Sequence, residues 1–126
     1  MIMNKIETQG APQPGGHYSQ AIAANNIVFV SGQLPVNPET GARTPESIEE
    51  QTLQVLKNIE AIVNAAGSGV SKITKMTLFI TDISLWDAVN KTYSEFFAEH
   101  RPARSIVPVK DLHHGFIIEA DAIAVI

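Results

Sequence analysis

The chain has 126 residues, of which 44% are hydrophobic and 17% charged, and it contains no cysteine. This length and composition suit one globular domain over residues 1–126. The missing cysteine excludes disulfides, thiolate zinc sites and cysteine nucleophiles. The net charge of −4 and the scattered basic residues argue against a nucleic-acid surface. Without a signal-peptide core or an apolar run of about 20 residues, we expect a cytoplasmic protein with no membrane partner.

The first third of the sequence predicts loops and two strands. Residues 9–16 are rich in Gly and Pro, which predicts a loop, and residues 17–23 are a candidate short strand. Residues 27–30 are β-branched or aromatic and predict a strand that ends at Ser31-Gly32. Residues 37–41 predict a turn, since they combine Pro with Gly.

A long amphipathic helix is predicted next. Thr44 is a plausible N-cap with Pro45 in the first turn, and Ser47 with Glu50 is an alternative capping box. Gly67 is expected to end the helix. Its apolar stripe at helical spacing consists of Ile48, Thr52, Val55, Leu56, Ile59, Ile62, Val63 and Ala66.

The second half predicts one strand, a second helix and two more strands. Residues 73–80 and 105–109 favour extended structure, as do residues 116–125. Asp82 or Ser84 caps the intervening helix, whose stripe is Trp86, Val89, Tyr93, Phe96 and Phe97. The order of elements indicates an α+β fold with both helices on one face of a sheet.

The predicted strands are apolar on both faces. The last strand alternates between Phe116, Ile118, Ala120, Ala122 and Ala124 on one face and Ile117, Glu119, Asp121, Ile123 and Val125 on the other. Two helices cover only one side of a sheet, and large exposed apolar patches usually contact a partner. We therefore expect other copies of the chain to close the open face.

Arg104 and Glu119 are the two residues that best indicate chemistry. Alternation places Arg104 and Ile106 on one face of their strand and Ser105 and Val107 on the other. A guanidinium offers a planar fork of donors that can hold a carboxylate by two parallel bonds. Glu119 lies among apolar residues, which raises the pKa of a carboxyl and suits it to proton transfer. The pair predicts a site for a small anionic substrate.

Other interpretations of the charged and titratable residues remain open. Arg104 is also compatible with a surface ion pair. Asp121 shares a face with Glu119 at about 6–7 Å, which resembles the paired carboxylates of glycosidases, although a structural ion pair is favoured. The adjacent His113 and His114 would point to opposite sides of an extended chain, so a loop is favoured over a metal site.

The uncharged candidates have equally open interpretations. The ring of Tyr18 could cover a pocket or pack on the core. Asn90 borders the apolar stripe of the second helix, where an amide usually bonds to neighbouring backbone. Ser31-Gly32 is either a turn or a place where backbone approaches a ligand closely.

The chain resembles the RidA family (YjgF/YER057c/UK114) in several separated motifs. Members of this family are small reactive-intermediate imine deaminases. The matching segments are Tyr18-Ser19-Gln20-Ala21, Ser31-Gly32-Gln33-Leu34-Pro35-Val36-Asn37-Pro38, Val89-Asn90-x-x-Tyr93, Pro102-Ala103-Arg104-Ser105, and Ile118-Glu119 with Ala122-Ile123-Ala124-Val125. The resemblance implies a chorismate-mutase-like fold, assembled as a homotrimer around a central barrel. It places the sites in clefts between subunits and implies no metal or cofactor.

The resemblance also implies roles for single residues. Arg104 matches the arginine that holds the substrate carboxylate, and Glu119 matches the acid that positions the attacking water. The matched pocket-lining positions are Tyr18, Ser31, Gly32 and Asn90. Two positions depart from the family pattern: Ile106 stands where the deaminase branch often has cysteine, and His17 stands where proline is common.

The implied reaction is hydrolytic deamination of 2-imino acids and their enamine tautomers to 2-keto acids and ammonia. Examples are 2-aminoacrylate, 2-iminopropanoate and 2-iminobutanoate, reactive metabolites whose removal limits damage. The alternative is a trimer that binds a keto acid without turnover, as a sensor or chaperone-like regulator, and Ile106 keeps this alternative open. Ribonuclease activity, also proposed in this family, fits poorly with the acidic charge balance.

Overall fold

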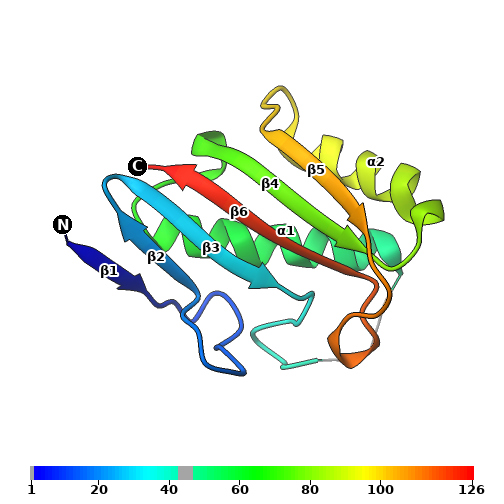
Figure 1. Ribbon diagram of the computed structural model, residues 1–126, viewed down its shortest axis with the longest axis horizontal. Coiled ribbons are helices and arrows are strands. Elements are labelled where there is room, and N and C mark those ends of the chain that lie inside the picture. The colour runs from blue at the N-terminus through cyan, green and yellow to red at the C-terminus, as the bar shows by residue number, and fades with distance from the viewer. Residues whose placement is uncertain (1, 43–46) are drawn as a thin grey trace.

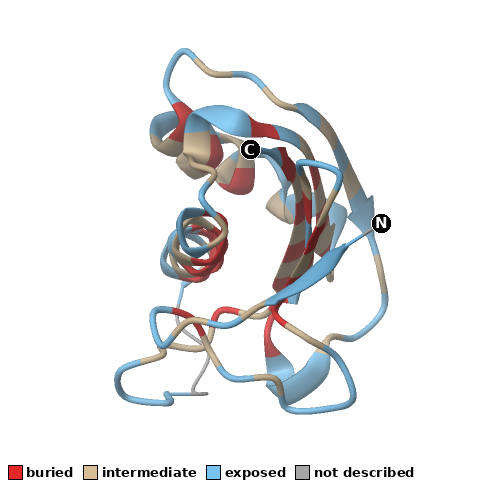
Figure 2. Ribbon diagram, turned by 90° about the vertical axis from the view of Figure 1, so that its left-hand side faces the viewer, coloured by how far each residue is buried: buried red, intermediate tan, exposed pale blue. Residues whose placement is uncertain are grey.

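The computed structural model describes residues 2–42 and 47–126, which form a six-stranded sheet with two helices packed on one face (Figure 1). The strands are β1 Met3–Ile6, β2 Ala21–Ala24, β3 Ile27–Gln33, β4 Ile73–Ile80, β5 Ala103–Pro108 and β6 Ile118–Val125. The helices are α1 Ile48–Ala65 and α2 Trp86–Phe97. The prediction of an α+β fold with both helices on one face is confirmed (Figure 2).

The sheet has the strand order β1-β2-β3-β6-β4-β5. Neighbouring strands are antiparallel except β4 and β5, which are parallel. A parallel pair needs a crossover connection, and α2 supplies it. This crossover leaves β5 at one edge of the sheet, beside α2 (Figure 1).

The ends of α1 follow from local hydrogen bonding. The Ser47 hydroxyl accepts a hydrogen bond from the Glu50 amide at 3.2 Å, so Ser47 is the N-cap as its pairing with Glu50 predicted. The Glu50 carboxylate accepts from the same hydroxyl at 3.1 Å. Thr44 and Pro45 lie outside the described residues. At the other end Gly67 has φ +84°, and Ser68 N–H bonds to Val63 O, a Schellman ending.

α2 begins one turn later than its sequence signal. Asp82 caps a short 3₁₀ turn, Ile83–Leu85, by accepting a hydrogen bond from the Ser84 amide at 2.8 Å. The α-helix then starts at Trp86. The members of its stripe that are buried are Val89, Tyr93 and Phe97.

The core lies between the sheet and the two helices (Figure 2). Along β6, Ile118, Ala120, Ala122 and Ala124 are buried against the helices, as the alternation predicts. The opposite face carries exposed apolar side chains on three strands: Phe29 is 47% exposed, Val107 37% and Val125 39%. Apolar surface therefore remains uncovered in the single chain.

Several strand boundaries differ from the predictions. β1 was not predicted, because Met3–Ile6 is short and almost fully exposed. The strand expected at residues 17–23 begins at Ala21, and the one expected from residue 116 begins at Ile118. In the described parts of the chain, no helix is long and apolar enough to cross a membrane.

Candidate active site

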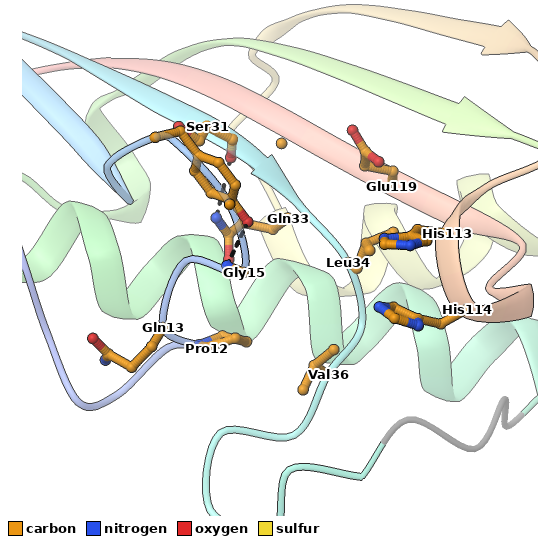
Figure 3. A pocket seen from close by; sticks show the side chains of 13 residues that line it. Pro12, Gln13, Gly15, Ser31, Gln33, Leu34, Val36, His113, His114 and Glu119 are labelled. Carbon is orange, nitrogen blue, oxygen red and sulfur yellow. Dashed lines mark hydrogen bonds between the residues drawn. The ribbon is translucent and has the colours of Figure 1, made fainter.

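Glu119 stands on the open face of the sheet, beside Phe79 of β4. It lines a cavity of about 590 Å³ at the carboxyl end of β3. The same cavity is lined by Tyr18, Ser31 and Gly32, three residues that the sequence analysis predicted as site residues. Figure 3 labels Ser31 and Glu119 among the lining residues. The cavity thus brings four of the predicted site residues together.

The end of β3 is shaped to accommodate the Glu119 carboxylate. A register shift between Val30 and Gln33 places two residues of β3 opposite one of β6. The strand therefore does not end at Ser31-Gly32, as predicted, but continues through a β-bulge to Gln33. A Cβ atom on Gly32 would overlap Oε2 of Glu119. The absence of a side chain at Gly32 therefore lets the carboxylate lie against the strand backbone.

Ser31 is fixed by hydrogen bonds to the segment before β2. Its hydroxyl donates to Ser19 O at 2.6 Å, and its amide donates to Gln20 O at 2.9 Å. Tyr18 lies on the same segment, where its hydroxyl accepts a hydrogen bond from Gly15 N–H at 3.3 Å. Tyr18 is 51% exposed and lines the cavity, so it does not pack in the core.

Gln20 anchors the loop that carries Tyr18, a function that the sequence did not reveal. The side chain is buried, and its Nε2 donates to the backbone oxygens of Thr8, Ala11 and Pro12. Its Oε1 accepts from Thr8 N–H at 2.7 Å. These bonds hold the Gly- and Pro-rich loop against the sheet and so define one wall of the cavity.

The environment of Glu119 favours its protonated form. Partial burial raises the pKa of the carboxyl, and the negative charge of Asp121 raises it further. Burial also raises the pKa of Asp121, while Lys75 acts in the opposite direction. Glu119 is thus a carboxyl suited to exchange protons at a higher pH than a solvated glutamate.

Arg104 is held on the other side of the sheet by α2. Its Nη1 donates to Asn90 Oδ1 at 2.9 Å. The guanidinium lies over the ring of Tyr93 at 4.7 Å and near the ring of Trp86 at 5.5 Å. Burial raises the pKa of Tyr93 to about 12, which leaves it neutral beside the arginine.

This arrangement orients the guanidinium without neutralising it. Asn90 does not bond to neighbouring backbone through its side-chain oxygen, as one interpretation expected, but accepts from Arg104. Within residues 2–42 and 47–126, no carboxylate forms an ion pair with Arg104. A cation that is fixed in place by neutral partners retains its capacity to bind an anion.

The two halves of the predicted site lie on opposite faces of one chain. Arg104 pairs with Met76 of β4, and Met76 pairs with Ala122 of β6, so these three residues share the helix-covered face. Glu119 is three residues from Ala122 and therefore projects from the other face. The Cα atoms of Arg104 and Glu119 are separated by two strand spacings across the sheet and by about three residues along the strand, which is roughly 14 Å. Ile106 shares the face of Arg104 and packs against the core.

His113 and His114 line the Glu119 cavity, which the sequence did not predict (Figure 3). An extended chain would point them to opposite sides, whereas here His114 has φ +62° and the two rings stack with centroids 3.9 Å apart. The loop assignment was correct, because both lie in the turn His113–Gly115. The described residues contain no cluster of three or more His, Asp or Glu suited to a metal.

Comparisons with known proteins agree with this architecture. The family model described as Endoribonuclease L-PSP matches residues 8–126. A RutC family protein from Pyrococcus abyssi is 43% identical over 98% of both chains. Reactive Intermediate Deaminase A, chloroplastic, from Arabidopsis thaliana is 44% identical over 94% of this chain and 64% of its own length.

Solved structures show the same fold. The structure of Escherichia coli TdcF with bound serine has a TM-score of 0.93 and 44% identity, covering 98% of each chain. YyfA of the Rid protein family from Yersinia pestis has a TM-score of 0.95 and 45% identity, covering 99% of this chain and 100% of its own. With its fold, its motifs and these relatives in agreement, the chain belongs to the RidA (YjgF/YER057c/UK114) family.

Proposed function

We propose that the protein hydrolyses 2-imino acids, and their enamine tautomers, to 2-keto acids and ammonia. The observation that carries this proposal is the guanidinium of Arg104, which is oriented by Asn90 and two rings and has no carboxylate partner among the described residues. Such a group is ready to bind the carboxylate of a small substrate through its remaining donors. The relative TdcF has a solved structure with bound serine, a small molecule that carries a carboxylate.

Arg104 and Glu119 act on one substrate only if two copies of the chain contribute to the site. We infer a homotrimer in which the β5 edge and α2 of one copy meet the open sheet face of the next. The exposed Phe29, Val107 and Val125 supply apolar surface for that contact. A heterologous interface of this kind repeats three times when the ring closes.

The chemistry needs positioning and one proton acceptor. An iminium carbon is already electrophilic, so holding it beside a water removes much of the barrier. Glu119 accepts a proton from that water as the C–O bond forms. The resulting carbinolamine is protonated on nitrogen and releases ammonia as its C–N bond breaks, and the hydroxyl loses a proton to give the keto acid.

The direct test is an assay in which an imine is generated in solution. A threonine dehydratase releases the enamine and imine of 2-oxobutanoate, and the added protein should accelerate keto-acid release. Arg104→Ala and Glu119→Gln should each lose most of this acceleration, since one removes the carboxylate anchor and the other the proton acceptor. Wild-type kcat/KM in the Arg104→Ala variant would refute the assignment.

The same assay separates turnover from binding. If the protein binds 2-oxobutanoate but does not accelerate its formation, the non-catalytic alternative is correct. The endoribonuclease description of the family model has less support here, because the chain carries a net charge of −4. RNA binding relies on clustered basic residues that contact phosphates.

A further inference from the structure

The stacked pair His113–His114 forms part of the wall of the Glu119 cavity. In Figure 3 both rings lie on the same side of the cavity and Glu119 stands above His113. The ring centroids are 3.9 Å apart and the ring planes differ by 24°. Two imidazoles therefore present their edges side by side in the site that we propose to be catalytic.

The turn that carries the pair is anchored by the two residues that follow it, just before β6. His114 and Gly115 both have positive φ, 62° and 76°, which turns adjacent side chains toward the same side. Phe116 is only 1% exposed, and its ring meets the His114 ring edge-on with centroids 6.3 Å apart. The following amide, Ile117 N–H, donates to Gln51 Oε1 at 3.0 Å. The pair is thus held in place before any ligand arrives.

The pair also differs chemically from the rest of the lining. Among the described residues that line the cavity, these two histidines are the only imidazoles, and Glu119 is the only carboxylate. A neutral imidazole offers one N–H donor and an imidazolium offers two. Two donors from parallel rings match the two oxygens of one carboxylate, as a fork of donors does in an arginine.

We propose that His113 and His114 recognise a second carboxylate, on the side chain of the substrate. This inference rests on the proposed function. It narrows the substrate class to the imines of acidic amino acids, which carry a carboxylate at each end. Arg104 of one copy binds the carboxylate next to the C=N carbon, and the histidines bind the other. The cavity volume of about 590 Å³ lies within the roughly 300–1,000 Å³ of ligand pockets and leaves room for such a side chain.

The test compares two stable keto acids of equal chain length by isothermal titration of the full-length protein. 2-Oxoglutarate ends in a carboxylate and 2-oxopentanoate ends in a methyl group. We expect 2-oxoglutarate to bind about tenfold more tightly, as a charge-assisted pair of hydrogen bonds would provide. Equal affinities for the two keto acids would overturn the proposal.

Variants separate recognition from structural support. In the double variant His113→Gln/His114→Gln, the ratio of the two affinities should fall to near one. The matched control is His17→Gln, because His17 is exposed and does not line the cavity, and its ratio should stay at the wild-type value. If the double variant weakens both keto acids by the same factor, the pair supports the cavity only and the proposal is wrong.

A kinetic measurement distinguishes this inference from the proposed function. An amino-acid oxidase generates the imines of glutamate and of 2-aminopentanoate in the presence of the protein. Faster hydrolysis of both imines without preference for the dicarboxylic one contradicts the inference and leaves the function intact. Tighter binding of 2-oxoglutarate with no hydrolysis of either imine supports the histidine site and contradicts the function.

Discussion

Gly32 and the carboxylate of Glu119 lie in direct contact, with no room for a Cβ atom between them. The bulge in β3 brings the glycine backbone up to the cavity, and β6 presents the glutamate from the neighbouring strand. The position of the Glu119 carboxylate, the proposed proton acceptor, therefore depends on the absence of a side chain at Gly32 of β3.

Gly32→Ala should lower activity without unfolding the protein. The added methyl group displaces the flexible end of Glu119, and we expect kcat/KM to fall about 100-fold, as misplacement by about 1 Å can cost. The control is Gly69→Ala, whose Cβ would meet Asn64 Oδ1 at an ordinary 3.8 Å. Unchanged activity in Gly32→Ala, with an unchanged melting temperature, would show that the carboxylate position does not matter.

The pH dependence should report the raised pKa of Glu119. Because the carboxylate form accepts the proton, kcat/KM should rise with pH through that pKa, which burial and Asp121 both raise. Asp121→Asn removes the neighbouring negative charge and should move this acid limb to lower pH. If the acid limb of the kcat/KM profile stays in place or moves to higher pH in this variant, Asp121 does not raise the pKa of Glu119 as proposed.

Asn90→Asp should block anion binding although it changes only an amide to a carboxylate. The new charge would sit 2.9 Å from the guanidinium and occupy it as an ion pair. We expect 2-oxobutanoate to bind at least about tenfold more weakly by titration calorimetry. Asn90→Ala keeps the cation unpaired and should weaken binding less; the reverse order would show that Asn90 itself contacts the ligand.

Tyr93→Phe should preserve or increase stability. The buried Tyr93 hydroxyl has no hydrogen-bond partner in the described parts of the chain, and an unpaired buried group costs about 1–3 kcal/mol. The ring itself packs against Phe97 at 4.6 Å and carries the Arg104 guanidinium, so Tyr93→Leu should be destabilising. Chemical denaturation of both variants checks this, and a loss above about 1 kcal/mol in Tyr93→Phe would indicate a partner for the hydroxyl.

Much of the fold followed from local patterns in the sequence. Ser47 and Gly67 mark the two ends of α1 because capping depends on residues within one turn. The alternation along β6 predicted which of its faces is buried, since strand periodicity is local as well.

The site was harder to predict because it depends on long-range pairing. Arg104 and Glu119 each have a clear strand periodicity, yet the face that each occupies follows from the register of β5 on β4 and of β4 on β6. The stacking of His113 on His114 depends on a positive φ at a non-glycine residue. In the sequence, the tight turn at residues 113–115 was indicated by Gly115, which follows the two histidines.

In the proposed trimer, Arg104 from one copy and Glu119 from another form one site. Arg104→Ala and Glu119→Gln chains, co-expressed with different affinity tags and purified through both, test it directly. In a ring of three that contains both variants, about one seam in three joins an intact arginine to an intact glutamate. We expect these mixed assemblies to regain a substantial fraction of wild-type imine hydrolysis, whereas each variant alone stays inactive. Mixed assemblies that are no more active than either variant would contradict the shared site.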